Sequence, residues 1–349
     1  MADPAVEMVM TVGGETDRKP TWKQELAAAF TDPMALLSAL ELTPAQLPRL
    51  DLRPAPLQRR ERFPLLVPRG FAALMRRKDP HDPLLRQVLP LADEAKAIAG
   101  FVSDPVGDGA AQRAPGLLQK YRGRALLIAT GACAAHCRYC FRRHFPYGGE
   151  GARRERFAAA LAALQRADTI EEVILSGGDP LMLDDATLAW LIEALDRIPQ
   201  LKRLRLHTRL PTLLPSRIGE RLCAILAGSR LRLVIVAHVN HAAELGPEAR
   251  RALLRLSDIG APLLNQSVLL RGVNDAVTPL AELSEALLDS RVLPYYLHLL
   301  DPVSGAAHFD VPEAEARALV TELRQRLPGY LVPRLVRERP GEACKTILL

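Results

Sequence analysis

From residue 116 onward, short apolar runs alternate with stretches of helical periodicity, and this alternation constrains the fold more than any other feature. Strands that alternate with helices indicate βαβ units and a parallel sheet. We expect strands at 125–130, 172–176, 203–208, 231–239, 262–270 and 293–300. The helices expected between them lie at 153–166, 184–197, 216–228, 247–259 and 278–289. This pattern predicts an α/β fold, a partial (β/α)6 barrel over residues 116–349, with its chemistry at the carboxyl ends of the strands.

Residues 1–115 predict an N-terminal helical arm that has no independent core. Asp32 followed by Pro33 is typical of a helix start, because aspartate caps a helix and proline fits its first turn. The segments expected in the arm are a disordered stretch at 1–20, helices at 33–40, from 44 and at 70–78, and an irregular connection at 50–68.

The composition is that of a soluble globular protein, with 48% hydrophobic and 25% charged residues. The net charge of +6 is compatible with an anionic cofactor or with nucleic acid. The basic runs at 59–62 and 76–78 lack the interleaved aromatic residues of an RNA-binding surface. The sequence shows neither a signal peptide nor an apolar stretch of membrane-spanning length. With an odd number of cysteines, these features predict a cytoplasmic protein with no membrane or nucleic-acid partner.

Three of the five cysteines, Cys133, Cys137 and Cys140, form a C-x3-C-x2-C motif directly after the first expected strand. Thiolates are metal ligands, and closely spaced thiolates suit zinc or an iron–sulfur cluster. A structural zinc site normally has four protein ligands, so a zinc loop that borrows His136 or His144 is one alternative. The other is a cubane cluster, which usually has four cysteine ligands and, with three, leaves one iron open.

The second expected strand is followed by Ser176-Gly177-Gly178-Asp179-Pro180. Glycines let a backbone edge approach a ligand closely, since no Cβ intrudes. Taken alone, the turn is also typical of an ordinary strand-to-helix connection. Its place beside the cysteine motif favours a ligand-binding turn.

The cysteine motif, with Tyr139 before its last cysteine, resembles the signature of radical S-adenosylmethionine (SAM) enzymes. From about residue 60 onward the chain resembles the lysine 2,3-aminomutases among them. The segments that carry this resemblance are DPHDPLLRQVLP at 79–90, SGGDPL at 176–181, HVNH at 238–241, NQSVLLRGVND at 265–275, RVLPYYLHLLD at 291–301 and PGEACKT at 340–346. The resemblance implies a radical SAM barrel, with a [4Fe-4S] cluster on the three cysteines, SAM, and pyridoxal 5′-phosphate (PLP) as cofactors.

The same resemblance assigns cofactor contacts to individual residues. Lys345 matches the lysine that forms a Schiff base with PLP, a reaction that needs a primary amine. The positions that match the surroundings of the PLP phosphate are Lys120, Tyr121, Arg124 and Gln266, with Lys120 in a place where the family tends to have arginine. The positions assigned to SAM, or to either cofactor, are Tyr139, Gly177, Gly178, Asp179, His238 and Asn240. For His238, a hydrogen-bonded histidine at the barrel end is an alternative.

The residues implied in substrate binding are Arg142, Asp301 and Glu338. Arg142 matches the arginine that pairs with the substrate carboxylate, a task that suits the planar guanidinium. Asp301 and Glu338 match two acids that receive the side-chain ammonium of lysine, although either acid is also interpretable as a structural ion-pair partner. Glu338 is one methylene longer than the aspartate usual in the family.

The implied reaction converts L-lysine to (R)-β-lysine. The reduced cluster passes one electron to SAM, and the resulting 5′-deoxyadenosyl radical takes hydrogen from C3 of lysine while the amino group moves from C2 to C3. The chain ends four residues after Lys345, and Ala276 stands where longer members have a zinc-binding cysteine. This short form resembles the enzymes that supply (R)-β-lysine for attachment to translation elongation factor P (EF-P).

The partners implied are the L-lysine substrate, a cellular one-electron donor and the EF-P lysyl-transferase that receives the product. Two alternatives remain open at this point. One is an aminomutase that makes a free β-amino acid as an osmolyte or antibiotic precursor. The other is a zinc-stabilised RNA-binding module.

Overall fold

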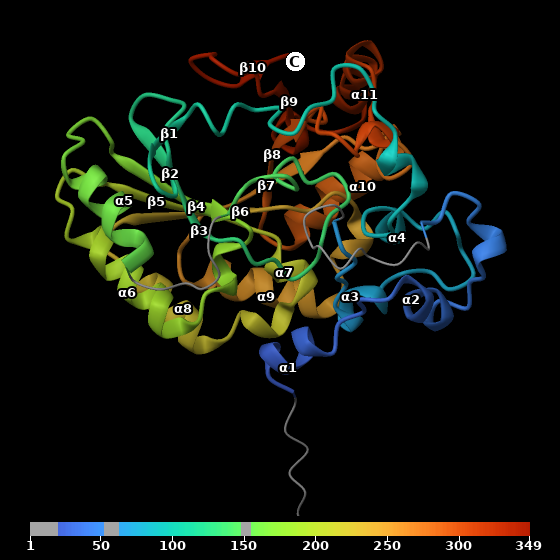
Figure 1. Ribbon diagram of the computed structural model, residues 1–349, viewed down its shortest axis with the longest axis horizontal. Helices are drawn as coiled ribbons and strands as arrows, with labels where there is room; N and C mark the ends of the chain where they lie inside the picture. The colour runs from blue at the N-terminus through green and yellow to red at the C-terminus, as the bar shows by residue number, and fades with distance from the viewer. Residues whose placement is uncertain (1–19, 52–62, 148–154) are drawn as a thin grey trace, which may run out of the picture.

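The computed structural model describes residues 20–51, 63–147 and 155–349, which form an α/β fold around one sheet (Figure 1). Ten strands follow one another in chain order across this sheet. Strands β3 to β9 pair in parallel, and antiparallel pairing occurs only at the edges, where β1, β2 and β10 lie. The strands are β1 (Gln112–Ala114), β2 (Leu117–Leu118), β3 (Arg124–Thr130), β4 (Glu172–Gly177), β5 (Arg203–Thr208), β6 (Arg232–Ala237), β7 (Leu263–Val268), β8 (Leu293–His298), β9 (Arg334–Arg337) and β10 (Thr346–Ile347).

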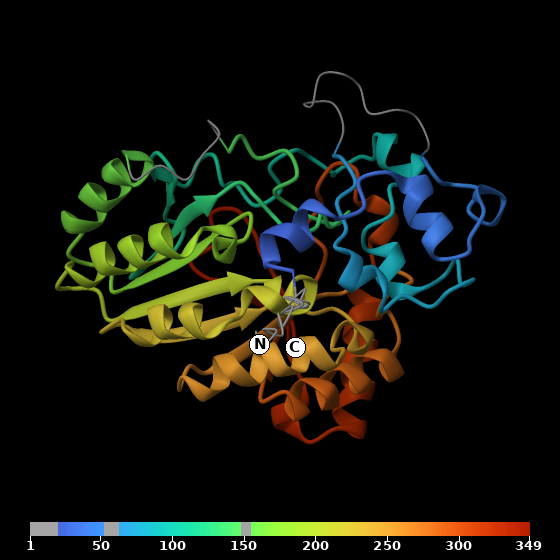
Figure 2. The ribbon, with the colours of Figure 1, turned by 90° about the horizontal axis from the view of Figure 1, so that it is seen from below.

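Six helices each follow a parallel strand and lie on the outer side of the sheet (Figures 1 and 2). They are α5 (Glu155–Gln165), α6 (Asp185–Asp196), α8 (Glu220–Ala227), α9 (Pro247–Asp258), α10 (Val277–Asp289) and α11 (Glu313–Arg326). The six predicted strands correspond to β3–β8, so the partial (β/α)6 barrel is confirmed. The first residues of the helix predicted at 153–166 lie outside the described residues.

Two parts of the barrel were not predicted, α11 and the seventh parallel strand β9. Strand β9 is only four residues long, and its two buried residues, Leu335 and Val336, have a charged arginine on each side. Such a short apolar run gives no recognisable period. The same reason applies to β2, which consists of two leucines.

The arm contains α1 (Trp22–Ala27), α2 (Pro33–Ala39), α3 (Arg69–Ala72) and α4 (Pro83–Arg86). Asp32 caps α2 as predicted, because its carboxylate accepts the backbone N–H groups of Met34 and Ala35. A 3-10 helix, Pro44–Gln46, occupies the second predicted start. The disordered stretch expected at 1–20 lies outside the described residues but for its last residue, and most of the irregular connection expected at 50–68 also lies outside them.

The helix expected at 70–78 is wrong beyond Ala72, where α3 ends. The carboxylate of Asp82 accepts the backbone N–H of Arg76 at 3.1 Å, which removes that donor from a helical ladder. Lys78 then has a φ of +60°, a left-handed conformation that an α-helix does not contain.

Arm and barrel share one hydrophobic core. Phe71 and Leu84 of the arm belong to the same buried set as Leu204 and Leu206 of β5. Figures 1 and 2 show helices α2, α3 and α4 of the arm, in blue and cyan, on the opposite side of the molecule from α5 and α6. Among the described residues, no helix is both long and apolar enough to cross a membrane.

Several short helices complete the connections. One is α7 (Leu210–Leu213), which follows β5. Besides Pro44–Gln46, the 3-10 helices of the described residues are Ala92–Ala95, Pro180–Met182, Pro215–Arg217, Ala242–Glu244, Ala307–Phe309 and Gly329–Leu331.

Candidate active site

The cysteine loop, residues 131–143, leaves the carboxyl end of β3 and packs against the glycine turn that follows β4. The backbone N–H of Gly178 donates to the carbonyl of Thr130 at 2.7 Å, and that of Asp179 donates to Ala132 at 2.8 Å. A Cβ at Gly178 would lie 2.2 Å from the carbonyl oxygen of Ala132. Gly177 has a φ of +117°, and a Cβ there would lie 2.5 Å from the oxygen of Thr130. Both glycines are therefore needed for the close approach of these two loops.

Asp179 ties this turn to the end of β5. Its carboxylate accepts hydrogen bonds from the Thr208 hydroxyl at 2.9 Å and from the backbone N–H groups of Arg209 and Leu181. Burial raises the pKa of Asp179 to about 6, despite these hydrogen bonds. The carboxylate thus has its partners within the protein and fixes the carboxyl ends of neighbouring strands.

The three thiols of the cysteine loop are free, partly exposed and close enough to affect one another's pKa. Burial raises the pKa of Cys133 above its usual value, and Cys140 adds to that effect. Burial and, after it, the neighbouring Cys137 raise the pKa of Cys140 to about 11. Three thiols on one loop are the donor set that a cluster with one open iron requires.

The geometry does not favour a mononuclear zinc site. Nδ1 of His136 lies 3.0 Å from the carbonyl oxygen of Pro64, and Nε2 of His144 lies 3.1 Å from that of Ser304. Both candidates for a fourth zinc ligand therefore contact backbone oxygens.

The arm holds the cysteine loop from its outer side. The backbone N–H of His136 donates to Leu66 at 3.1 Å, and that of Arg138 donates to Gln87 at 2.9 Å. The guanidinium of Arg138 also bonds the carbonyl of Phe63 and pairs with Glu94. These contacts join the arm directly to the residues around the cysteines.

Arg209, directly after β5, was not identified from the sequence. Its Nη1 donates to Sγ of Cys137 at 2.7 Å, and its Nη2 donates to Gln87 at 2.7 Å and Glu244 at 3.0 Å. The guanidinium and the Glu244 carboxylate are both buried. A buried cation therefore lies against one thiol of the cysteine loop.

Tyr139, His238 and Asn240 form one hydrogen-bonded group. The Tyr139 hydroxyl is 2.9 Å from Nε2 of His238 and accepts a hydrogen bond from Nδ2 of Asn240 at 2.6 Å. Asn240 is fully buried, and its Oδ1 accepts the backbone N–H of Val268. Burial lowers the pKa of His238 to about 3, so its imidazole is neutral at pH 7. This geometry matches the alternative of a hydrogen-bonded histidine at the barrel end.

Five charged side chains, which we call the charge network, connect the cysteine loop to the C-terminal segment. Arg142 donates from Nε to Oδ2 of Asp108 at 2.6 Å, and Lys120 Nζ lies 2.7 Å from Oδ1 of the same carboxylate. Lys120 also lies 3.4 Å from Oε1 of Glu338, whose other oxygen pairs with Lys345. The network therefore brings together four of the predicted site residues, and Asp108 is a fifth member that the sequence did not reveal.

Asp301 lies just beyond β8, near the end of this network. Burial raises the pKa of Asp301 to about 7, while the charge of Lys345 lowers it and that of Glu338 raises it. Its buried Oδ1 has no hydrogen-bond partner among the described residues. An inward-facing carboxylate oxygen with this environment is available to a cationic ligand.

The remaining predicted contacts lie on β3, β7 and the residues before them. The guanidinium of Arg124 lies over the ring of Tyr121, at 4.6 Å from its centroid. Burial raises the pKa of Tyr121, and the charge of Glu338 raises it further. Nε2 of Gln266 lies 3.4 Å from Nδ1 of His207. The effect of Glu338 on Tyr121 places these two residues near each other.

Two partly buried histidines, His207 on β5 and His298 on β8, were not identified from the sequence. Their Nε2 atoms have no hydrogen-bond partner among the described residues, and burial lowers the pKa of both. Together with Oδ1 of Asp301, these atoms give the barrel interior unsatisfied polar groups near Lys345. A polar cofactor such as PLP fits that environment. Only the position of the histidines at strand ends could have signalled them.

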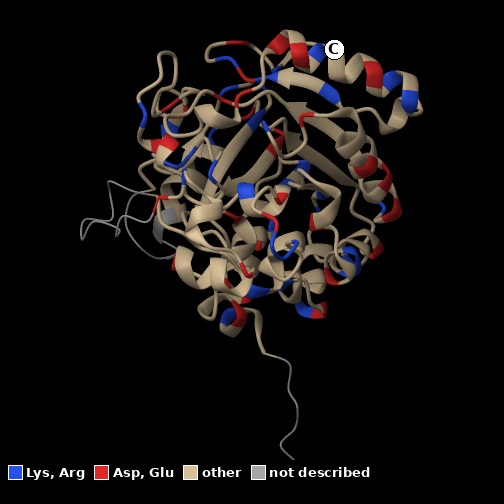
Figure 3. Cartoon of the chain, turned by 90° about the vertical axis from the view of Figure 1, so that its right-hand side faces the viewer, with Lys and Arg blue, Asp and Glu red and all other residues tan. Residues whose placement is uncertain are grey.

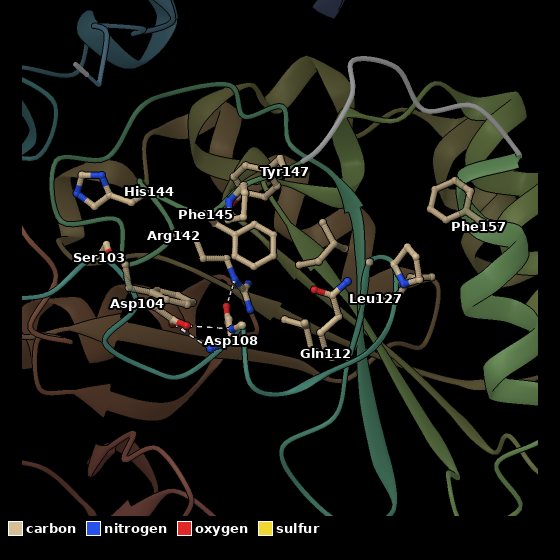
Figure 4. A pocket seen from close by; sticks show the side chains of 17 residues that line it. Ser103, Asp104, Asp108, Gln112, Leu127, Arg142, His144, Phe145, Tyr147 and Phe157 are labelled. Carbon is tan, nitrogen blue, oxygen red and sulfur yellow. Dashed lines mark hydrogen bonds and ion pairs between the residues drawn. The ribbon is translucent and has the colours of Figure 1, made fainter. Parts of the chain in front are cut away.

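A cavity of about 380 Å³ lies beside Arg142 (Figure 4). Figure 4 shows Arg142 and Asp108 joined on its wall, with Phe145 and Tyr147 near them. Phe157 of α5 lines another part. Lys345 does not line this cavity, which therefore borders the charge network at its Arg142 end.

Charges are mixed over the outer surface. Figure 3 shows Lys and Arg interspersed with Asp and Glu over the described part of the chain. Alternating signs of this kind, as on α11 with Glu313, Glu315, Arg317 and Arg324, do not make the single basic face that nucleic acid binding uses.

Comparison with known proteins identifies the family of the chain. Residues 127–282 match the model of the radical SAM superfamily. The chain is 47% identical over 333 residues to L-lysine 2,3-aminomutase of Escherichia coli (strain K12), a match that covers 95% of this chain and 96% of that protein. It is 44% identical to L-lysine 2,3-aminomutase of Haemophilus influenzae, over 93% of this chain and 95% of that protein. It is 36% identical to L-lysine 2,3-aminomutase of Clostridium subterminale, over 79% of this chain and 66% of that protein. The chain therefore belongs to the L-lysine 2,3-aminomutase family of the radical SAM superfamily.

Proposed function

We propose that this protein converts L-lysine to (R)-β-lysine and that an EF-P lysyl-transferase attaches the product to EF-P. Family membership makes the chain an isomerase, a radical SAM aminomutase whose cofactors are a [4Fe-4S] cluster, SAM and PLP. The observation that supports the assignment of lysine is the charge network, in which ion pairs connect Arg142 to Glu338 through Asp108 and Lys120.

The cysteine loop is the proposed seat of the iron–sulfur cluster. Cys133, Cys137 and Cys140 would be its protein ligands, and the bound cluster and SAM would supply the radical that starts the reaction. The remaining residues proposed near SAM are Tyr139, Gly177, Gly178, Asp179, His238 and Asn240. The hydrogen bonds of Asp179 and Asn240 to the protein support a role in shaping this region.

Lys345 is the proposed attachment point of PLP, which supplies the carbonyl carbon that carries the migrating nitrogen. Lys120, Tyr121, Arg124 and Gln266 are proposed around its phosphate, where cations and hydrogen-bond donors suit a dianion. The orphaned polar atoms of His207 and His298 near Lys345 support a polar cofactor at this place.

The substrate would be held at both ends. Arg142 is proposed to receive the carboxylate, and Asp301 and Glu338 the distant ammonium. Although burial raises the pKa of Glu338, the charges of Lys345 and Lys120 hold it below its usual value, so this acid is ionised at pH 7. Two carboxylates at the distal end would attract the side chain of lysine and repel that of glutamate.

The fate of the product is the less direct part of the proposal. The chain matches nearly the whole E. coli protein but 66% of the clostridial one, which supports a relation to the shorter members. We also propose a cytoplasmic location, which suits five free cysteines, and a cellular one-electron donor. The zinc-stabilised RNA-binding module is not retained, because family membership provides another use for the cysteines.

The reaction is tested with anaerobically reconstituted protein, SAM, PLP, a reductant and L-lysine, followed by chiral chromatography. We expect (R)-β-lysine, and no product from Cys140→Ala. Addition of EF-P and its lysyl-transferase should then increase the mass of EF-P by one β-lysyl group. If β-lysine forms but EF-P keeps its mass, the product serves as a free β-amino acid. If lysine is recovered unchanged with an intact cluster, the substrate assignment is wrong.

A further inference from the structure

Asp108 is the one member of the charge network that no motif of the sequence singles out. We propose that Asp108 is a positioning residue, which fixes the guanidinium of Arg142 so that its outer edge faces the carboxylate of the substrate. This inference rests on the proposed role of Arg142 and deepens it.

The loop that carries Asp108 is itself well fixed. The side chain of Asp104 accepts the backbone N–H groups of Asp108 and Gly109, each at 2.9 Å. Gly107 has a φ of +68°, and a Cβ at this position would lie 3.3 Å from Pro340, in the same segment as Lys345. Asp108 therefore lies where the arm meets both the cysteine loop and the C-terminal segment.

The carboxylate of Asp108 contacts two cations and little else. It lies 2.6 Å from Nε of Arg142 and 2.7 Å from Nζ of Lys120, and its side chain is 2% exposed. Although burial raises the pKa of Asp108, Arg142 and then Lys120 hold it below its usual value. The group is therefore an ionised carboxylate at pH 7, with a charge-assisted hydrogen bond from Arg142 and an ion pair with Lys120.

The contacts of Arg142 define which part of its guanidinium remains available. Nε donates to Asp108, and Nη1 donates to the Ser176 hydroxyl at 3.3 Å. With Nε occupied, a carboxylate ligand is left with the end formed by the two Nη atoms, which suits a bidentate contact. Both Arg142 and Asp108 line the cavity of about 380 Å³ (Figure 4). Asp108 thus prevents the rotation that would turn Nε toward the ligand.

A purely structural ion pair would stabilise the fold without sensing the substrate carboxylate. The two roles are separated by comparing L-lysine with L-lysinamide, which lacks that carboxylate. The protein carrying its cluster and PLP is titrated anaerobically with each compound, and the change in PLP absorption gives Kd. The variants are Asp108→Asn, which removes the charge, and Asp108→Glu, which keeps the charge but displaces it. Asp185→Asn is the matched control. Asp185, on α6 and away from this site, also pairs with a buried arginine, Arg217, at 2.8 Å.

For Asp108→Asn we expect the Kd of lysine to rise by about tenfold or more, since hydrogen bonds between charged groups are the strong ones. The Kd of lysinamide should stay close to that of the unmodified protein, and Asp108→Glu should show the same selectivity with a smaller effect. If the Kd values of both compounds rise equally in Asp108→Asn, or neither rises, Asp108 is only structural and the proposal is wrong. If Asp108→Asn does not fold, the same comparison with Asp108→Glu decides. If the unmodified protein binds lysine and lysinamide equally well, the role proposed for Arg142 itself fails.

Discussion

Nζ of Lys120 lies 3.4 Å from Oε1 of Glu338, although 218 positions separate the two residues. The resemblance to the lysine 2,3-aminomutases implies arginine at the first of these positions and aspartate at the second. Because the departures contact each other, we interpret them as one compensated change. Glu338 also pairs with Lys345, so its length affects both cations.

We predict that Glu338→Asp alone lowers kcat/KM for lysine, because the shorter side chain withdraws from both ammonium groups. Addition of Lys120→Arg should recover part of that loss. Residues in contact commonly show coupling energies of about 0.5–3 kcal/mol. The effect of the double substitution on kcat/KM should therefore differ by several-fold from the product of the two single effects. Steady-state kinetics on the two single variants and the double variant measure this. Strictly additive effects would mean that the departures are independent.

Lys345→Ala should abolish both the absorption of protein-bound PLP and the formation of β-lysine. The iron content and the slow reductive cleavage of SAM should persist, since the cysteine loop does not include Lys345. Visible spectroscopy and analysis of 5′-deoxyadenosine check the two halves separately. A PLP band unchanged in Lys345→Ala would assign the cofactor to another lysine.

The acid limb of activity should depend on Asp301. Burial raises the pKa of Asp301 to about 7, so its carboxylate becomes protonated as the pH falls through that value and no longer attracts an ammonium group. We therefore expect kcat/KM for lysine to rise with pH through about 7. Asp301→Asn should lower kcat/KM by about tenfold or more and remove that limb of the profile. A profile of the same shape in Asp301→Asn would exclude Asp301 as the group that titrates.

Iron binding should depend on the three cysteines of the loop alone. Cys344 is exposed, and Cys223 lies on α8, where its Sγ is 4.0 Å from the carbonyl oxygen of Arg255. Cys344→Ala and Cys223→Ala should keep their iron after anaerobic preparation, whereas Cys140→Ala should lose it. Iron and sulfide analysis measures this directly, and loss of iron from Cys344→Ala would revise the ligand set.

Arg209 should raise the reduction potential of a cluster bound at Cys137. A donor and a positive charge beside a cysteine sulfur favour the reduced, more negative cluster. Arg209→Lys keeps the charge but shortens the reach to Sγ, so the midpoint potential should become more negative. Redox titration followed by electron paramagnetic resonance measures it. Arg217→Lys is the control, because Arg217 is equally buried but bonds Leu181 and Leu183. Equal potentials in both variants would remove Arg209 from this role.

The barrel was predictable because its strands are long enough to show periodicity and its helices carry apolar faces. The arm was less predictable, since α3 ends at Ala72 and the backbone N–H of Arg76 bonds Asp82, a contact that no local pattern reveals. Strand β9 was not predicted because its four residues are too few to show a period. Each of these errors concerns a segment whose conformation depends on residues elsewhere in the chain.

The site residues also differ in how far the sequence alone could identify them. The spacing of Cys133, Cys137 and Cys140 is enough by itself to indicate a metal or cluster site. Lys345, in contrast, could be recognised only through the segment around it. Asp108 lies in a sequence that resembles a surface turn, and it enters the site only because that turn packs on Pro340. Arg209 likewise meets Cys137 across 72 positions.

The backbone contacts of the arm with His136 and Arg138 should affect how long a bound cluster lasts in the presence of oxygen. They attach the arm to the two residues that flank Cys137. Oxygen reaches a buried cluster through local openings of the structure, which need less free energy than global unfolding. The lifetime of a cluster held here would therefore follow the stability of the arm, even under conditions in which the barrel stays fully folded.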